Sequence, residues 1–261
     1  MKITGFISRK GLQLIVLSIV MSFFVGCASI PEGQPRSKKD PWELVNRNVF
    51  SFNESLDKYV VKPITQVYEF IFPVYVRERF SNVFANVGDV YTAVNQLLQG
   101  KPKTAVEDLT RVIVNTTFGI GGIFDVATEA GLEKHSEDFG QTFGVWGIGD
   151  GPYMMLPLLG PSNVRDTVGW AFDLQTDILL TYIDNIPVRN TITGIRIVDQ
   201  RSKYLSSTSL LGEAAFDKYT FIRDAYIQRR RNRIYDGNPP LIDDDDDIPD
   251  EMLEKEESRV R

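Results

Sequence analysis

Histidine and cysteine are almost absent from this chain of 261 residues, in which His135 and Cys27 are the only examples. A single histidine excludes the HExxH motif and any metal site that needs two histidines, and a single cysteine excludes a disulfide within the chain. The GxSxG motif of a nucleophile elbow is also missing, since the relevant loop reads Gly160-Pro161-Ser162-Asn163-Val164. We therefore expect no enzyme and no metal or cofactor, and we interpret His135 as a surface residue.

Nucleotide and nucleic-acid sites are equally poorly supported. The glycine cluster Gly119-Ile120-Gly121-Gly122 follows a helical pattern and lacks the lysine of a P-loop. The net charge of −6 comes largely from residues 243–257, which hold ten acidic residues and one lysine. The rest of the chain has no basic face of the kind that binds nucleic acid.

Long apolar runs are confined to the N-terminus. Lys2, Arg9 and Lys10 precede an apolar segment from Leu12 to Val25, whose length is that of a signal-peptide core rather than a membrane-spanning helix. It ends at Phe24-Val25-Gly26-Cys27, which resembles a lipobox, and Ala28 follows as in lipoproteins sorted to the outer membrane. We expect lipid on Cys27; the alternative is an ordinary cleaved signal with a stray thiol.

Composition divides the chain into four parts. We expect a signal peptide at 1–26, a flexible lipidated tether at 27–39, one helical domain at 40–236 and a disordered acidic tail at 237–261. Arg229, Arg230, Arg231 and Arg233 close the domain, either as a solvated helix end or as a patch for lipid headgroups.

The domain is predicted to be all-α. Asp40-Pro41-Trp42-Glu43 predicts a helix start with Asp40 as N-cap. The spacing of the apolar residues predicts a stripe along one helix face, made of Trp42, Val45, Val49, Phe52, Leu56 and Tyr59. Asn46 and Asn53 interrupt this stripe, and Arg47 lies on the polar face. A second helix is predicted from Ser162, with Val164, Val168, Ala171, Ile178 and Tyr182 on one face and Asp166, Asp173 and Asp177 on the other. Further helices are predicted at 79–98, 103–116, 189–206 and 213–234. Such stripes suit either a soluble core or a membrane interface.

A strip of apolar residues is framed by glycine and proline between Gly144 and Pro161. This composition predicts a hairpin that packs on apolar surface or enters lipid. Its membrane-contact candidates are Tyr153, Met154, Met155, Leu156, Leu158 and Leu159.

Several motifs in order over about 40–205 resemble the MlaA (VacJ) lipoprotein family. They are Asp40-Pro41-Trp42-Glu43, Asn46-Arg47, Phe52-Asn53, Ser81-Asn82-Val83-Phe84, Asn95 to Lys101, Asn115 to Gly122, Asp138 to Thr142, Gly151-Pro152-Tyr153, Leu156 to Ser162 and Val164-Arg165-Asp166. The resemblance implies a helical ring in the inner leaflet of the outer membrane, with a central amphipathic channel, beside trimeric porins. It implies transfer of mislocalised phospholipids from the outer leaflet to a periplasmic carrier protein.

Asn46, Arg47 and Asn53 are the candidates for the lipid path, because a headgroup that crosses hydrocarbon needs polar partners. The alternatives are helix-to-helix hydrogen bonds in the core for the two asparagines and a surface salt bridge for Arg47. Two other functions remain open: a structural envelope lipoprotein that acts as a scaffold, and a phospholipase, although no nucleophile and base pair is evident.

Overall fold

The structure, a computed structural model, describes residues 37–205 and 217–240. The predicted signal peptide, Cys27 with most of its tether, and the acidic run from Asp243 therefore lie outside the described residues. Within them the prediction of a helical domain with one short hairpin is confirmed.

The helices form a long series with one hairpin inserted. In chain order the elements are α2 (Glu43–Leu56), the π-helix η1 (Asp57–Val61), α3 (Lys62–Ile71), α4 (Val74–Leu98), α5 (Pro102–Thr117), α6 (Val126–Glu129), α7 (Phe139–Val145), β1 (Tyr153–Leu156), β2 (Gly160–Asn163), α8 (Val164–Thr176), α9 (Ile178–Tyr182), α10 (Ile186–Lys203) and α12 (Lys218–Ile234). The two strands pair antiparallel, with Tyr153 opposite Asn163 and Leu156 opposite Gly160.

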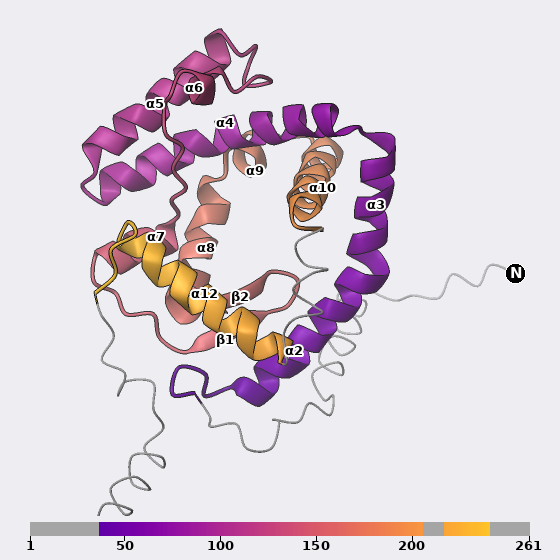
Figure 1. The fold of residues 1–261 in the computed structure, drawn as a ribbon, viewed down its shortest axis with the longest axis vertical. Coiled ribbons are helices and arrows are strands. Elements are labelled where there is room, and N and C mark those ends of the chain that lie inside the picture. The colour runs from indigo at the N-terminus through magenta and orange to yellow at the C-terminus, as the bar shows by residue number, and fades with distance from the viewer. Residues whose placement is uncertain (1–36, 206–216, 241–261) are drawn as a thin grey trace, which may run out of the picture.

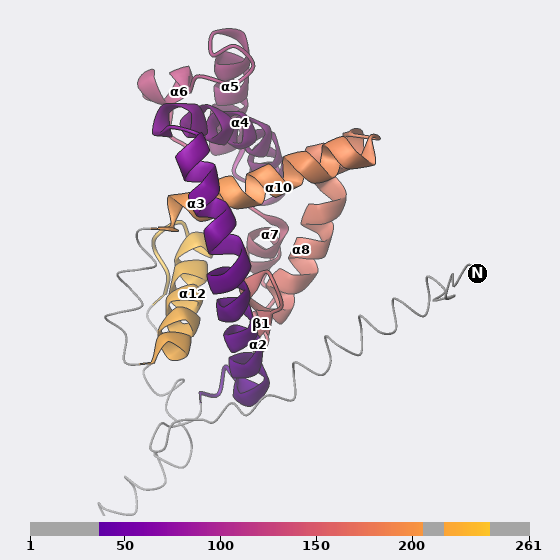
Figure 2. The ribbon, with the colours of Figure 1, turned by 90° about the vertical axis from the view of Figure 1, so that its right-hand side faces the viewer.

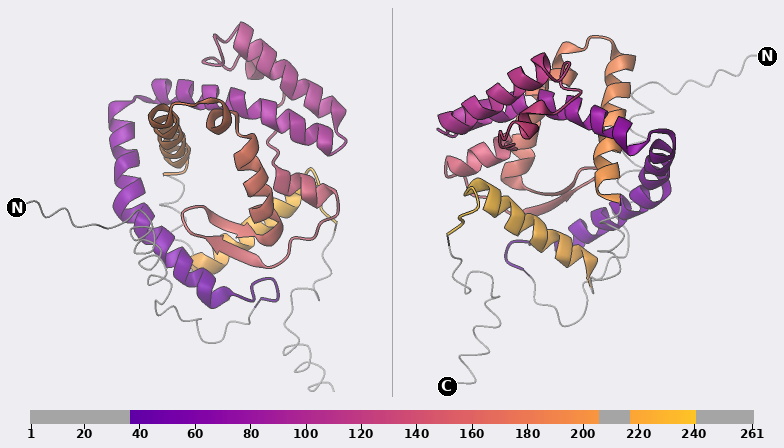
Figure 3. Two further views of the ribbon diagram at one scale, coloured as in Figure 1. Left: turned by 180° about the vertical axis from the view of Figure 1, so that it is seen from behind. Right: turned by 45° about the horizontal axis from the view of Figure 1, so that its top comes forward.

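The helices are arranged as an open frame. In Figure 1, α2, α3 and α4 follow one another around one side and the top, while α12, α7 and the hairpin lie along the other side. The view from behind in Figure 3 shows the same frame. Helix α10 packs on α3 and α4, and Figure 2 shows it running across the molecule.

Helix starts differ from the sequence predictions where a polar side chain has another partner. Asp40 is not the N-cap of α2; that position is Trp42, and the buried Asp40 carboxylate instead accepts hydrogen bonds from Asn46 and Tyr219. Residue Ser162 belongs to β2, so α8 begins at Val164 with Asn163 as its cap. The predicted continuous face to Tyr182 is also interrupted, because Asp177 ends α8 and caps α9.

Other predicted helices agree closely with the structure. The segments 79–98, 103–116 and 189–206 correspond to α4, α5 and α10. Helix α4 begins earlier than predicted, directly after Pro73, which stands at its N-cap. For the predicted helix at 213–234, the described part is α12 from Lys218 onward.

Polar residues occupy the buried positions of this fold. Among the described residues, buried polar and charged side chains outnumber buried hydrophobic ones by more than two to one. Arg111 and Asp108 have no exposed surface, whereas Phe70 is 90% exposed and Tyr59 70% exposed. This distribution is the reverse of the usual one in water-soluble proteins. Within the described ranges no helix is both long and apolar enough to cross a membrane.

Helix α2 shows the inversion most directly. Its predicted apolar stripe is largely exposed at Trp42 and Val45, while Glu43, Asn46 and Arg47 are buried. Arg47 was predicted on the polar face, and the structure buries that side chain beside the carboxylates of Glu43 and Asp217. The small hydrophobic cluster is Val49, Tyr153, Met155 and Tyr219, with Phe50, Ile222, Tyr226 and Ile227 packed around it.

Candidate functional site

A cavity of about 250 Å³ lies among α4, α8, α9 and α10 and forms the candidate site. Its volume is just below the range of roughly 300–1,000 Å³ that is usual for ligand pockets. Its lining combines apolar and polar groups: Phe84, Val87, Gly88, Trp170, Leu174 and Ile178 with Tyr91, Asp173, Asp177 and Arg196.

Helical periodicity explains how the chain builds this lining. The four lining residues of α4 are Phe84, Val87, Gly88 and Tyr91, at spacings of three and four, which place them on one face. The run Trp170, Asp173, Leu174 and Asp177 repeats the same spacing along α8 and its C-cap. A Cβ added at Gly88 would meet nothing within 4 Å, so this glycine leaves the cavity open.

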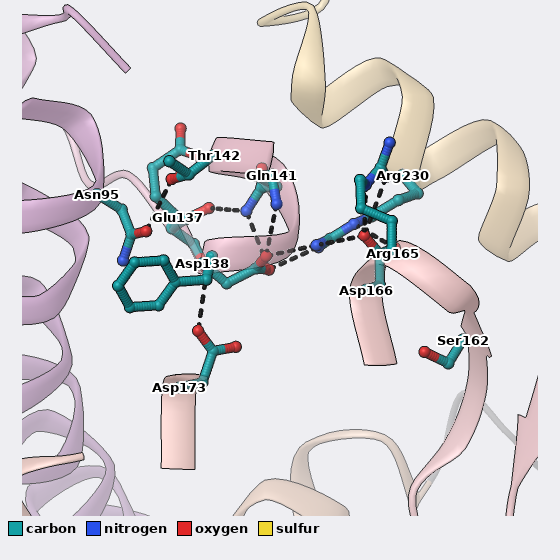
Figure 4. Close-up of polar contacts among 12 residues, drawn as sticks. Asn95, Glu137, Asp138, Gln141, Thr142, Ser162, Arg165, Asp166, Asp173 and Arg230 are labelled. Atoms are coloured by element: carbon teal, nitrogen blue, oxygen red, sulfur yellow. Dashed lines mark hydrogen bonds and ion pairs between the residues drawn. The ribbon is translucent and has the colours of Figure 1, made fainter. Parts of the chain in front are cut away.

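Asp173 is the partly buried carboxylate of the cavity. Its Oδ1 accepts a hydrogen bond from the Phe139 N–H at 3.0 Å and another from the Tyr91 hydroxyl. Figure 4 shows Asp173 directed toward the first turn of α7. No hydrogen bond to Oδ2 is formed within 37–205 and 217–240. Burial raises the pKa of Asp173 to about 6, since desolvation disfavours the charged carboxylate.

Arg196 and Asp177 form the second polar group of the cavity. The Nη1 of Arg196 lies 2.6 Å from Asp177 Oδ2, while Asp177 Oδ1 accepts the N–H groups of Leu179 and Leu180. Both oxygens of Asp177 are therefore occupied by protein groups. Arg196 makes no other hydrogen bond in the described part of the chain, and its side chain is 46% exposed.

A largely buried ionic network joins α7, α8 and α12. Arg230 of α12 lies between Asp138 at the start of α7 and Asp166 at the start of α8 (Figure 4). Burial opposes ionisation of Asp138, but the hydrogen bonds from Arg230 hold its pKa below its usual range. Both predicted roles for the arginine cluster, a solvated end and a headgroup patch, are therefore wrong for Arg230, which joins three helices inside the molecule.

The structure places Asn46 between α2 and the hairpin. Its Nδ2 donates to the Tyr153 carbonyl at 3.1 Å and to Asp40, and its Oδ1 accepts the Met155 N–H at 2.9 Å. The side chain is buried and does not line the cavity. This arrangement matches the structural alternative for Asn46, except that the partner is a strand rather than a second helix.

Asn53 and Arg47 are also engaged with protein groups. Asn53 donates to the Leu156 carbonyl at 2.9 Å and accepts the Leu158 N–H at 2.8 Å. Arg47 pairs with Glu43 and Asp217, and its guanidinium lies 4.5 Å from the centroid of the Tyr219 ring. Neither residue lines the cavity, so the structure does not support the predicted path along α2.

The hairpin residues divide into two groups. Tyr153 and Met155 are 1% and 4% exposed and belong to the hydrophobic cluster, so their predicted membrane contact was wrong. Strand alternation explains this result, since every second side chain faces inward. Met154 and Leu156 are half-buried, whereas Leu158 and Leu159 at the tip are 70% and 51% exposed.

The periodicity of the sequence places Asp173 and Asp177 on one polar helix face but does not predict the cavity. Its residues come from helices up to 112 positions apart, between Phe84 and Arg196. The only sequence signal was the repeated three-and-four spacing of mixed polar and apolar side chains on α4 and α8. His135, predicted at the surface, is partly buried, with Nδ1 3.1 Å from Asp108 Oδ2.

Known proteins resemble this chain over most of its length. A family model described as MlaA lipoprotein matches residues 38–233. The "Intermembrane phospholipid transport system lipoprotein MlaA" of Escherichia coli (strain K12) is 34% identical over 84% of this chain and 87% of its own length. An uncharacterised protein of Rickettsia bellii (strain RML369-C) is 33% identical over 75% of this chain and 76% of its own.

A solved structure has the same fold. It is described as the structural basis for maintenance of bacterial outer membrane lipid asymmetry, and it is 32% identical in sequence with a TM-score of 0.64. The alignment covers 77% of this chain and all of the solved one. The family resemblance of the motifs is thus confirmed by sequence and by structure: this chain belongs to the MlaA lipoprotein family.

Proposed function

We propose that this chain removes mislocalised phospholipids from the outer leaflet of the outer membrane and passes them to a periplasmic lipid carrier, which maintains lipid asymmetry. The observation that carries the proposal is the amphipathic cavity among α4, α8, α9 and α10. The names of the relatives in Escherichia coli and Shigella flexneri, which describe intermembrane phospholipid transport, support it.

The chemistry of the cavity suits a molecule with a charged end and apolar chains. A charged headgroup is costly to move through hydrocarbon unless polar groups or water accompany it. Asp173 and Arg196 provide such groups, and Phe84, Trp170 and Leu174 provide apolar surface. In this proposal the chain is a conduit without catalysis, and no side chain reacts with the lipid.

The exposed apolar side chains support a position of the domain at the interface of a bilayer. Phe70 of α3 and Leu158 at the hairpin tip are largely exposed, and such surfaces favour the interfacial region of a bilayer. We propose that acyl chains on Cys27 anchor the chain to the outer membrane, with the domain at 40–236 on the periplasmic side. Trimeric porins and a periplasmic phospholipid carrier are the proposed protein partners.

Obstruction of the cavity tests the proposal. The variant Gly88→Trp places the largest side chain into the cavity at a position where a Cβ meets open space. Gly194→Trp is the matched control, because Gly194 is also helical and open but does not line the cavity. Each variant is expressed in cells that lack the native protein, and growth is measured in detergent with a chelator.

At normal abundance Gly88→Trp should restore growth poorly, and Gly194→Trp should restore it fully. Equal restoration by both variants would contradict a lipid path through this cavity. It would then favour the structural alternative, a lipoprotein that scaffolds the envelope without moving lipid.

A further inference from the structure

We infer that the cavity prefers phospholipids whose headgroup carries a primary ammonium, with Asp173 accepting the ammonium hydrogens and Arg196 contacting the phosphate. This inference rests on the proposed function and adds the class of lipid that the cavity takes. Ethanolamine phospholipids have this headgroup chemistry.

Asp173 has the geometry of a receptor for a cation. The Tyr91 hydroxyl and the Phe139 N–H both donate to Oδ1 and fix the orientation of the carboxylate. Oδ2 has no hydrogen-bond partner within the described residues, and Asp173 lines the cavity. An ammonium group placed there would donate to Oδ2 and compensate for the desolvation that raises the pKa of this carboxyl.

Arg196 supplies the opposite charge on the same cavity. Only its Nη1 is engaged in the described structure, through Asp177. A guanidinium has five N–H donors, so several remain for phosphate oxygens. Asp177 pairs with Arg196, and Asp173 is therefore the lining carboxylate that has no salt bridge of its own among the described residues.

This charge pattern discriminates among headgroups. A zwitterionic headgroup with an ammonium gives Asp173 a counter-charge, whereas an uncharged glycerol headgroup leaves the lipid anionic and Asp173 without one. A trimethylammonium has the right charge but no N–H to donate. Hydrogen bonds between charged groups are stronger than neutral ones, so the ethanolamine lipid should be retained about tenfold better than either alternative.

Competitive retention of lipid measures this preference. Full-length acylated protein in detergent micelles is mixed with equal amounts of phosphatidylethanolamine, phosphatidylcholine and phosphatidylglycerol that have the same acyl chains. After removal of free lipid, mass spectrometry quantifies each retained species. Asp173→Asn is the test variant, because its Oδ1 still accepts from Tyr91 and Phe139 and the fold is preserved. Asp184→Asn is the charge-matched control, at an exposed position outside the cavity.

The expected result is retention of phosphatidylethanolamine about tenfold above the other two lipids by the wild type and Asp184→Asn. Asp173→Asn should retain all three within about twofold of each other. Soluble glycerophosphoethanolamine in excess should not displace the bound lipid, since it lacks the acyl chains.

The outcomes separate the inference from the function. Equal retention of the three lipids by the wild type would overturn the inference and leave the conduit intact, and so would an unchanged preference in Asp173→Asn. Displacement by glycerophosphoethanolamine would identify a site for the free headgroup and would also overturn it. Retention of no lipid at all would contradict the proposed function itself.

Discussion

The side chain of Asn53 holds the tip of the hairpin by accepting the N–H of Leu158 at 2.8 Å, across 105 positions of sequence. Leu158 adopts a φ of 69°, a left-handed conformation that costs a residue with a side chain about 1–2 kcal/mol. The hydrogen bond that the Leu158 N–H donates to α2 offsets part of that cost. The backbone at the exposed tip is therefore tied to α2.

Leu158→Asp should weaken membrane association without unfolding the protein. The side chain is 70% exposed, so the change removes little internal packing. A charge at the centre of a bilayer costs about 2.5–3.5 kcal/mol, and a shallower position costs less. Flotation with lipid vesicles measures the association, and thermal unfolding in detergent measures stability.

Met155→Asp provides the contrasting variant, because Met155 is buried in the hydrophobic cluster and an unpaired charge there should unfold the domain. If Leu158→Asp lowers the melting temperature as much as Met155→Asp does, the tip packs inside the protein and the assigned membrane contact is wrong.

Asn46→Leu should destabilise the fold rather than selectively block transport. The substitution leaves the Met155 N–H, the Tyr153 carbonyl and the Asp40 carboxylate without this partner. Each unsatisfied buried group costs about 1–3 kcal/mol, so a total loss of roughly 3 kcal/mol or more is expected. Chemical unfolding measures it, with the exposed Asn190→Leu on α10 as control. A variant that keeps native stability but loses transport would place Asn46 on the lipid path after all.

Arg47→Ala should also reduce stability, because it leaves two carboxylates unpaired in a partly buried site. The side chain of Arg47 is 10% exposed and contacts Glu43 and Asp217 at 2.8 and 2.6 Å. Removal of one partner from a buried ion pair costs about 3–5 kcal/mol. Protein abundance in cells and unfolding in denaturant should both decrease, whereas Lys103→Ala, at an exposed position, should change neither. Unaltered stability in Arg47→Ala would show that the guanidinium is free to bind another anion.

Asp173 should make the protein less stable as pH rises. Its pKa is raised by burial to about 6 in the folded state, compared with 3.8 for an ordinary aspartate. The folded state therefore favours the protonated form, and this favourable contribution is complete below about pH 4 and lost as the pH rises through about 6. Unfolding free energies for the wild type and Asp173→Asn should diverge over this interval by on the order of 1–3 kcal/mol. Parallel pH profiles would contradict the burial of this carboxyl.

Helical segments could be predicted from this sequence, but their inward faces could not. The apolar spacing along 41–60 identifies a helix because side chains three and four positions apart share a face. Assignment of the apolar face to the interior assumes water outside, and this molecule buries Glu43, Asn46 and Arg47 instead. The hairpin was predicted from its glycines and prolines, while the inward direction of Tyr153 and Met155 depends on the packing of β1 against α2 and α12.

The cavity was beyond sequence reasoning because it depends on contacts between distant helices. Tyr91 of α4 and Asp173 of α8 meet across 82 positions, and Asp177 and Arg196 meet because α9 packs against both α8 and α10. The motifs nevertheless identified the family, since many short segments match it in order. Recognition of the family therefore did not require correct placement of the site.

The content of phospholipid in the outer leaflet of the outer membrane, measured in cells with and without this protein, tests the central claim most directly. Cells that lack the protein should accumulate outer-leaflet phospholipid, and expression of the wild-type chain should return it to the original amount. An outer leaflet whose phospholipid content is unchanged by loss of the protein would contradict the conduit.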